Sequence, residues 1–443
     1  MIICGVDFFQ GARIIVFPEY GIYGLGWTRK TIAPFLESIP DPDVKPAWNP
    51  CDKPALFDSE VQSNLSCIAK NNSIYVVANF GNRHPCNKSD AKCPSDGFYQ
   101  FNTNLVYGPN GDFVARYFKY NIEANETPYF DKPPTVNHTT FETPFGKFAT
   151  LCSKDILHKE PTVTLLKTMN ITNLALPVAW KEELPLMSAI EFHSSFAEGW
   201  LIDVLAANLH VPELGYYGSG LYYPRYTSFD ATYYYDDDMS SSGSLVVQNV
   251  TRQVLPPDNS ETSEGAQIDT QYKKRSLDFN TNFVDSYNDV THKIEINGDV
   301  YDAKVFKCDQ YSSQTVCQGT LCCGMDVEGS ASGDLFAFAA FDGLHTKGET
   351  YHLQSCAFIK CAGNTIKSCG EPAKTSATGV DKLSMIGNFS SSYQFPEVLT
   401  LGQKPELVPV LWLYQGSIIV DVGLNGNALT VAIQAIDYDK EVP

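Results

Sequence analysis

Two neighbouring side chains with nucleophilic atoms lie near the end of the strand-like segment 145–157. Cys152 supplies a thiol, Ser153 supplies a hydroxyl, and Asp155 follows closely. The thiol is the stronger nucleophile, because a few per cent of an ordinary cysteine is already thiolate near neutral pH. The segment therefore predicts covalent catalysis, in which Ser153 attacks directly or Cys152 is turned toward the substrate by a local bulge.

Hydrolysis of an unactivated amide also needs a proton acceptor and a group that stabilises the oxyanion. Glu19 follows the apolar run 14–17, and the carboxyl end of such a strand is where α/β sheets open to ligands. Lys119 ends a predicted hairpin strand, and Glu126 lies seven residues beyond it. Each of these residues taken alone could be an ordinary surface charge, so the prediction depends on the segments acting together.

The elements that would hold these groups alternate between strand and helix in the first half of the chain. Short apolar runs bounded by turn residues predict buried strands at 14–17, 73–80 and 174–177. Segments 98–107 and 112–120 flank a Gly-Pro-Asn-Gly turn and predict a hairpin. Residues 185–208 have a helical pattern with Leu201 and Val204 on the apolar face. This alternation predicts a layered α/β domain.

The second half of the chain has a different character. Residues 256–275 are polar and predict a linker between a first domain at 1–255 and a second domain at 276–443. Beyond the linker the chain is rich in strand-like runs such as 335–341. Seven of the 13 cysteines lie between positions 308 and 369, which predicts a β-rich domain cross-linked by disulfides.

Composition excludes several classes of function. The net charge of −19 argues against nucleic acid or an anionic membrane as partner, since both would repel the chain. No run of 18 apolar residues occurs, so no membrane-spanning helix is predicted. The cysteines lack the paired spacing of a zinc site, and Glu191 and His193 lack a third ligand, so we predict no metal site.

Cysteine and asparagine usage indicates an oxidising compartment. Disulfides persist in secreted proteins, and the chain carries eight N-x-S/T sequons, which predict N-linked glycans. No secretory leader is recognisable at Met1. We therefore expect a secreted or cell-surface protein whose sequence begins after a missing N-terminal segment.

The order of these motifs resembles a known family. The Pro-Glu pair at Glu19, the Lys-x-Asn motif at Lys119 and the strand that runs into Asp155 resemble the nitrilase (carbon–nitrogen hydrolase) superfamily, and more narrowly its vanin (pantetheinase) and biotinidase branch. Stretches that support this resemblance occur in both halves of the chain, at 178–180, 184–186, 188–194, 207–210, 218–222, 321–323, 341–346 and 395–399. The resemblance covers nearly the whole chain.

The resemblance implies an α/β fold, in which a four-layer α-β-β-α sandwich is followed by a smaller, β-rich, disulfide-containing C-terminal base domain. It implies that Glu19 is the general base, Lys119 the oxyanion stabiliser and Glu126 an acidic residue that orients them. In the family a cysteine attacks the amide carbonyl, and water then resolves an acyl-thioester without a cofactor. Vanins split pantetheine and biotinidase cleaves biotinyl amides, so the expected partner is a small-molecule amide.

Three further residues are expected to contact that substrate: Tyr23, Trp180 and His193. For His193 a place in the core or at a helix cap is the competing interpretation, because a Glu–Lys–nucleophile triad needs no histidine. The resemblance also implies that a leader and the first strand of the sheet precede Met1. The first domain is therefore expected to be N-terminally truncated, with an exposed sheet edge.

The nucleophile position departs from the family pattern. The family cysteine stands two residues before the aspartate, and here Ser153 occupies that position, with Cys152 one residue earlier. Because neighbouring side chains of a strand point to opposite faces, we expect Ser153 to face Glu19 and Lys119. Cys152 is then expected to face away from both. Since Lys154 also replaces the usual aromatic residue, impaired amidase activity is predicted.

Two other hypotheses stay open. The chain could be a catalytically inactive member of the family that binds a small amide or a protein partner. Alternatively, the hydrolase scaffold could serve only to support the second domain of a secreted glycoprotein. A glycan at the sequon of Asn125, which overlaps Glu126, would crowd the site and favour this structural role.

Overall fold

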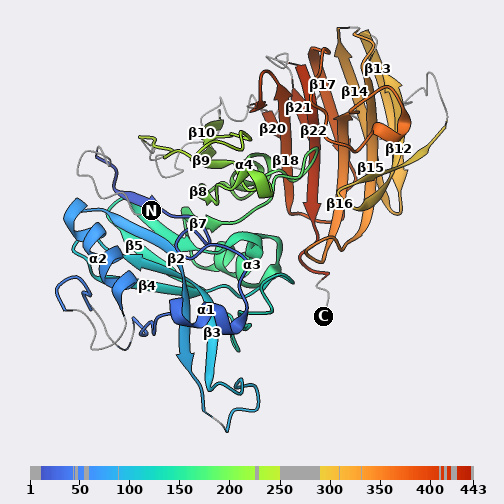
Figure 1. Cartoon of the computed structure of the whole chain (residues 1–443). Coiled ribbons are helices and arrows are strands. Elements are labelled where there is room, and N and C mark those ends of the chain that lie inside the picture. The colour runs from blue at the N-terminus through green and yellow to red at the C-terminus, as the bar shows by residue number, and fades with distance from the viewer. Residues whose placement is uncertain are drawn as a thin grey trace, which may run out of the picture.

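The computed structural model describes most of the chain, and Figure 1 shows its course. The described residues are 11–42, 44, 48–53, 59–87, 89–224, 229–249, 290–308, 310–330, 332–408, 411–413, 417–420 and 427–440. The predicted linker at 256–275 and the expected truncation before Met1 lie outside these residues. The domain boundaries at 1–255 and 276–443 therefore stay predictions.

One sheet of the first domain has the strand order β1-β2-β3-β4. Its strands are β1 (Ile14–Val16), β2 (Tyr75–Pro85), β3 (Phe98–Tyr107) and β4 (Phe113–Phe118). β1 runs parallel to β2, and the other neighbours are antiparallel. The predicted hairpin is confirmed as β3 and β4, and Gly111 supplies its left-handed turn residue with a φ of 87°.

The other sheet of the first domain has the order β10-β9-β8-β7-β6-β5, with β6, β7 and β8 parallel. Its strands are β5 (Thr140–Thr143), β6 (Gly146–Thr150), β7 (Asn173–Val178), β8 (Asp203–Asn208), β9 (Ser219–Pro224) and β10 (Phe229–Tyr234). The α-helices of the described first domain are α1 (Arg29–Ile32), α2 (Glu60–Asn72), α3 (Lys159–Thr168) and α4 (Ala189–Trp200). Short 3-10 helices are η1 (Ala33–Phe35), η2 (Ser153–Leu157) and η3 (Pro212–Leu214).

The helix predicted at 185–208 is too long. α4 ends at Trp200, and Leu201 caps it with a left-handed φ of 53°. The chain then enters β8, so Val204 lies in a strand and not on the helix. The prediction was wrong there because a short apolar run cannot be assigned to helix or strand by its periodicity alone.

The two sheets of the first domain pack face to face. Val77 and Val106 of one sheet share a buried apolar cluster with Phe148 and Ala175 of the other. α2 packs against β2 and β3 on one outer face, and α4 packs against β8 and β9 on the opposite side (Figure 1). The predicted α-β-β-α sandwich is therefore confirmed.

The C-terminal region consists of two further sheets, with the orders β11-β12-β15-β16-β22-β18-β19 and β13-β14-β17-β21-β20. Their strands are β11 (His292–Ile296), β12 (Asp299–Lys307), β13 (Gln310–Gln318), β14 (Leu321–Gly329), β15 (Leu335–His345), β16 (Tyr351–Lys360), β17 (Val380–Gly387), β18 (Gln394–Leu401), β19 (Pro405–Leu407), β20 (Leu411–Leu413), β21 (Ser417–Val420) and β22 (Asn427–Ile436). A 3-10 helix, η4 (Ile366–Ser368), joins β16 to β17. Buried side chains such as Met325, Phe338 and Leu383 fill the space between the sheets. The predicted β-rich domain is confirmed.

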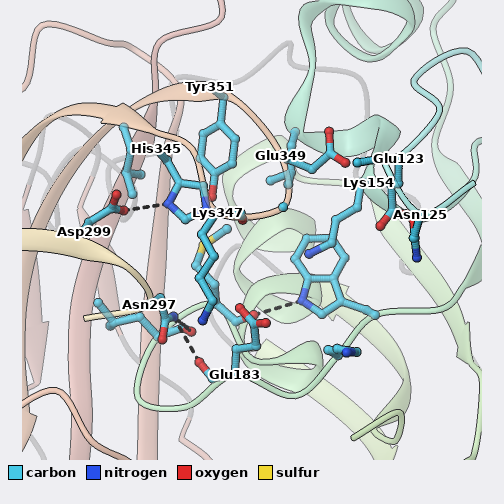
Figure 2. A pocket seen from close by; sticks show the side chains of 18 of the residues that line it. Glu123, Asn125, Lys154, Glu183, Asn297, Asp299, His345, Lys347, Glu349 and Tyr351 are labelled. Atoms are coloured by element: carbon cyan, nitrogen blue, oxygen red, sulfur yellow. Dashed lines mark hydrogen bonds and ion pairs between the residues drawn. The ribbon is translucent and has the colours of Figure 1, made fainter. Parts of the chain in front are cut away.

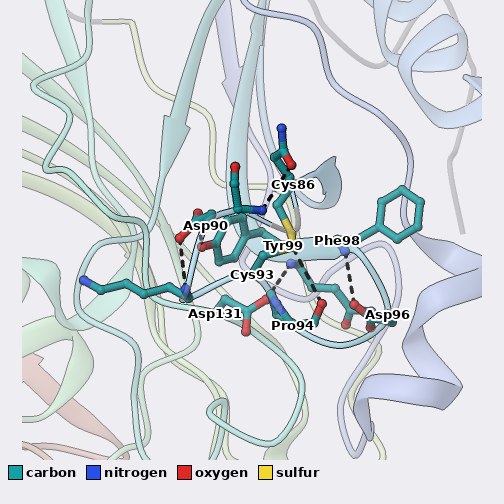
Figure 3. The surroundings of a disulfide bond; sticks show 12 residues. Cys86, Asp90, Cys93, Pro94, Asp96, Phe98, Tyr99 and Asp131 are labelled. Carbon is teal, nitrogen blue, oxygen red and sulfur yellow. Dashed lines mark hydrogen bonds between the residues drawn. A yellow bond between two sulfur atoms is a disulfide. The ribbon is translucent and has the colours of Figure 1, made fainter.

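Five disulfides cross-link the described residues. They join Cys51 to Cys67, Cys86 to Cys93, Cys317 to Cys322, Cys323 to Cys356, and Cys361 to Cys369. The predicted framework is therefore confirmed in the C-terminal region and extends to the early cysteines. Figure 3 shows the Cys86–Cys93 bond closing the loop between β2 and β3, where the Tyr99 hydroxyl donates to Asp90 at 2.7 Å.

The first domain packs against the seven-stranded sheet through α4. The ring of Phe395 on β18 lies 5.7 Å from the rings of both Phe192 and Phe196 on α4, measured between centroids. The Tyr438 hydroxyl donates to the backbone carbonyl of Ile156 at 2.6 Å. These contacts join the two regions into one continuous apolar core. Within the described part of the chain, no helix is both long enough and apolar enough to cross a membrane.

Candidate active site

Lys119 lies just after the end of β4, and its ammonium group contacts three carboxylates. Its Nζ lies 3.0 Å from Glu19 Oε1, 2.9 Å from Glu123 Oε1 and 2.7 Å from Glu126 Oε2. Burial would lower the pKa of Lys119, but the three carboxylates together hold that pKa well above its ordinary value. Lys119 is therefore cationic in the folded protein, as a group that stabilises an oxyanion must be.

Three asparagines from β2 and β3 form a buried polar layer beside these charges: Asn79, Asn102 and Asn104. The Asn102 amide donates to Glu19 Oε1 at 2.7 Å and to Glu126 Oε1 at 2.8 Å. Sequence reasoning missed this asparagine layer. The usable signal was a pair of asparagines at alternate positions, 102 and 104, of a predicted strand.

Glu19 is placed to accept a proton. Burial raises its pKa to about 7, an effect that the Lys119 ammonium partly offsets. Its Oε1 accepts hydrogen bonds from Asn102 and Lys119, while its Oε2 has no hydrogen-bond partner within the described chain. A carboxylate with one uncommitted oxygen and a pKa near 7 fits a general base.

Glu126 is held more firmly than Glu19. It accepts hydrogen bonds from the Tyr20 hydroxyl and from the backbone N–H of Glu123, the latter at 2.9 Å. Together with Asn102 and Lys119, these donors occupy both of its oxygens. Such a carboxylate can fix the positions of its neighbours but has no free lone pair directed at a substrate.

Ser153 stands at the sharp turn between β6 and η2. Its φ is 46°, a left-handed conformation that is uncommon for a residue with a side chain. Its hydroxyl accepts a hydrogen bond from the Ala179 N–H at 3.4 Å. Asp155 fixes the turn, because its carboxylate accepts hydrogen bonds from the Tyr117 hydroxyl at 2.6 Å and from the Asn121 N–H at 2.9 Å.

The predicted orientation of Cys152 is wrong. Its thiol lies 3.5 Å from the Asn79 amide nitrogen and 4.0 Å from Asn102 Oδ1, on the same side as Glu19. Strand alternation misled the prediction, because β6 ends at Thr150 and Ser153 already belongs to η2. No hydrogen bond joins Ser153 to Glu19 or Lys119 in the part of the chain that is described. Burial raises the pKa of the Cys152 thiol, and the Glu19 carboxylate raises it further.

A cavity of about 330 Å³ opens between the hydrolase sandwich and the C-terminal sheets. Figure 2 shows Asp299, His345 and Tyr351 on one side of it and Lys154 and Glu123 on the other. Its inner wall adjoins the buried groups, because the lining residue Ala179 donates to Ser153. The lining carboxylate of Glu123 likewise contacts Lys119. Sequence reasoning missed the residues that the C-terminal region contributes.

Lys154 and Trp180 both line this cavity. The Lys154 ammonium lies 3.4 Å from the centroid of the Trp180 ring, which is a cation–π contact. The indole N–H donates to the backbone carbonyl of Met187 at 2.9 Å and so fixes the ring. Burial lowers the pKa of Lys154, although Glu123 and Glu183 oppose this shift.

Tyr23 and His193 do not line the cavity. The Tyr23 hydroxyl donates to Asn79 Oδ1 at 3.2 Å and belongs to the asparagine layer. His193 lies behind Trp180, with 5.0 Å between ring centroids, and burial lowers its pKa to about 3. Contact of these two side chains with a substrate therefore stays a prediction, whereas Trp180 does line the cavity. Among the described residues, no group of three potential ligands is close enough to hold a metal ion.

Comparisons with known proteins agree with the geometry. Residues 7–189 match the carbon-nitrogen hydrolase family, and residues 291–439 match the vanin C-terminal domain. Mouse pantetheinase is 42% identical over 98% of this chain and 81% of its own length. Rat biotinidase is 36% identical over 97% of this chain and 84% of its own length. A solved amidase of the nitrilase superfamily from Nesterenkonia AN1 covers 51% of this chain and 77% of that chain, with 17% identity and a TM-score of 0.34.

Proposed function

Because the chain belongs to the carbon–nitrogen hydrolase family, in the branch of the pantetheinases and biotinidases, we propose that it binds a small amide in the cavity beside Lys154 and hydrolyses it slowly. Ser153 then holds the position of the attacking group. Glu19 acts as the general base, and Lys119 stabilises the oxyanion.

The observation that carries this proposal is the conformation of Ser153. A nucleophile at a tight turn between a strand and a helix projects its side chain above the end of the strand. A left-handed residue costs energy, and such strain is common at functional sites. Ser153 has this conformation, with a φ of 46°. Cys152 is extended, with φ of −129° and ψ of 120°, so it continues the strand instead of standing at the turn.

The proposed reaction follows from the groups around the turn. Glu19 takes the proton of the Ser153 hydroxyl while the oxygen bonds to the amide carbon, and Lys119 stabilises the negative charge on the carbonyl oxygen. The C–N bond then breaks, and the amine leaves with the proton from Glu19. Water, deprotonated by Glu19, hydrolyses the resulting ester and restores the hydroxyl. The first step is slow because a hydroxyl is a weak nucleophile beside a carboxylate alone.

A non-catalytic binding protein is the second candidate. Its support is that Ser153 forms no described hydrogen bond with Glu19, and that Glu19, Lys119 and Ser153 all have fully buried side chains. Lys154 lines the adjoining cavity and lies over the Trp180 ring. In this case the cavity binds its ligand without turnover.

Two assays distinguish a slow amide hydrolase from a non-catalytic binding protein. They measure release of cysteamine from pantetheine and release of free biotin from a biotinyl amide. We expect slow release by the native protein, loss of release in Ser153→Ala and a gain of at least about tenfold in Ser153→Cys, equivalent to about 1.4 kcal/mol of barrier. Ser195→Cys is the matched control, because it places a buried thiol on α4 away from the site. The proposal fails if Cys152→Ala abolishes release and Ser153→Ala does not.

The five disulfides fit an oxidising compartment. We therefore also propose that the protein is secreted or displayed at the cell surface with N-linked glycans. Asn125 is an exposed sequon residue that lines the cavity, so a glycan there would narrow its mouth. Mass spectrometry of the secreted protein tests occupancy at Asn125.

A further inference from the structure

We propose that the cavity between the two domains selects small molecules that carry a carboxylate, and that the Lys154 ammonium is the group that binds this carboxylate. This proposal rests on the proposed function in one respect, because the same cavity is taken as the substrate-binding site. It does not depend on turnover by Ser153.

Lys154 occupies a position in which a bound carboxylate would stabilise it. Its ammonium lies over the Trp180 ring, and both side chains line the cavity. Within the described chain it forms no hydrogen bond and no ion pair. Glu123, Glu183 and Glu349 favour its charged form from a distance, but none of them forms an ion pair with it. Distant charges and a ring face offset only part of the cost of burying an ammonium group. A ligand carboxylate would supply the missing charge through a strong charge-assisted hydrogen bond.

The partners of the surrounding carboxylates provide the second argument. Three acidic residues that line the cavity are already bonded to side chains other than Lys154. Glu123 contacts Lys119 at 2.9 Å, Glu349 contacts His158 at 3.0 Å, and Asp299 contacts His345 at 2.6 Å.

The charges that line the cavity are of both signs. Lys154, Lys181 and Lys347 line the cavity together with one further carboxylate, Glu183. Figure 2 shows Lys347 between the two walls, opposite Lys154. With Glu123, Glu349 and Asp299, the lining has four carboxylates against three ammonium groups. The preference for an anion therefore depends on the Lys154 ammonium, which forms no hydrogen bond or ion pair within the described chain, and not on the net charge of the cavity.

The cavity volume limits the ligand. About 330 Å³ lies at the lower end of the range for small-molecule sites. It therefore suits one small acid and not a peptide or a polymer. Leu157, Leu186 and Met187 contribute apolar lining, so the ligand is expected to join a short apolar body to a terminal carboxylate. The acid product of an amide hydrolysis has this chemistry, as does an amide substrate with a second, acidic end.

The test compares binding of an acid with binding of its neutral amide. Calorimetry measures pantothenate against pantothenamide, and biotin against biotinamide, so that each pair differs only in the charged group. The protein carries Ser153→Ala, which prevents hydrolysis of the amides during the measurement. We expect each acid to bind at least about tenfold more tightly than its amide, and this ratio to fall toward one in Lys154→Met.

Two further variants make the result interpretable. Lys154→Arg keeps the positive charge and should keep the preference for the acid. Lys167→Met is the matched control, because Lys167 also lies over an aromatic ring, Tyr393, at 4.6 Å, but lies outside the cavity. The inference is overturned if acids and amides bind equally, if neither binds at millimolar concentration, or if Lys154→Met leaves the ratio unchanged. Turnover of an amide without preference for its acid would uphold the proposed function and reject this inference alone.

Discussion

The neighbouring residues Cys152 and Ser153 lie in different surroundings, and the difference affects how reactive the Cys152 thiol is. Ser153 stands at the left-handed turn, while the Cys152 thiol lies in the buried asparagine layer with a pKa above its ordinary value. A thiol that stays protonated is a much weaker nucleophile than a thiolate. The other charged groups expected at the site are nevertheless in place, because Lys119 contacts both Glu19 and Glu126. Which of the two side chains attacks an amide is therefore the point that the Ser153→Ala and Cys152→Ala variants test.

The pKa of Glu19 predicts how kcat/KM of the Ser153→Cys variant depends on pH. A general base must be ionised, and burial raises the pKa of Glu19 to about 7. We expect kcat/KM of Ser153→Cys to increase as the pH rises through about 7, and to be lost in Glu19→Gln. Glu142→Gln is the control, because Glu142 is an exposed carboxylate on β5. A rate that does not change across this pH range would exclude Glu19 as the base.

We expect Asn102 to stabilise the folded protein as well as to hold Glu19 and Glu126 in position. Its amide donates to both Glu19 and Glu126, and a buried carboxylate that loses a donor costs about 1–3 kcal/mol. Asn102→Ala should therefore lower the free energy of unfolding in urea by at least about 2 kcal/mol. Asn110→Ala, in the exposed turn between β3 and β4, should change it little. Equal losses in the two variants would contradict this role.

At the scale of elements, the close contact of α4 with β18 depends on a small residue. A Cβ atom at Gly199 would lie 2.7 Å from the Gln394 carbonyl oxygen and 2.7 Å from the Phe395 ring. Alanine raises helix propensity by about 1 kcal/mol, but overpacking costs about 1–3 kcal/mol. Because a backbone oxygen cannot move aside easily, the second effect should dominate.

Gly199→Ala is therefore expected to lower the free energy of unfolding despite the better helix former. Urea denaturation measures this change. Ser63→Ala in α2 is the matched control, since α2 also gains propensity there and Ser63 is only half-buried. An increase in stability for Gly199→Ala would mean that α4 and β18 are less tightly packed than this contact implies.

At the scale of the whole molecule, the interface between the two regions buries acidic groups. Burial raises the pKa of Glu397 on β18 to about 8, and it raises the pKa of Glu191 on α4 as well. The backbone N–H of Met187 and the Gln434 amide donate to Glu397. Both carboxyl groups are therefore protonated in the folded protein over a range of pH in which the unfolded chain ionises them.

This difference predicts how stability varies with pH. A raised pKa contributes stability below the unfolded value, and this contribution is lost as the pH rises toward about 8. We expect the free energy of unfolding to fall between about pH 5 and pH 8, with a smaller slope in Glu397→Gln. His193 has the opposite effect below its unfolded pKa of 6.5, because burial lowers its folded pKa to about 3. The slope that Glu397 contributes is therefore measured between pH 6.5 and about 8. Glu60→Gln, on the exposed start of α2, should leave the slope unchanged.

Much of the fold could be predicted from local patterns. The hairpin of β3 and β4 follows from its Gly-Pro-Asn-Gly turn, and the buried strands follow from short apolar runs. Prediction failed at Leu201, where α4 stops and β8 begins, because both elements are apolar over the same few residues. A helix end that is set by a left-handed cap depends on the packing that follows it.

The sequence by itself determined the family and indicated the charged groups Glu19, Lys119 and Glu126, while the replacement of the nucleophilic cysteine by Ser153 stays a prediction. These follow from residue types and spacing along the chain. Only the tertiary structure decided that Cys152 lies in the asparagine layer on the side of Glu19, and that a cavity lined by Lys154 forms between the two regions. The physical reason is that packing between elements, and not the local pattern, sets the direction of side chains at the end of β6. The same packing brings together residues almost 200 positions apart, such as Lys154 and Tyr351, which line one cavity.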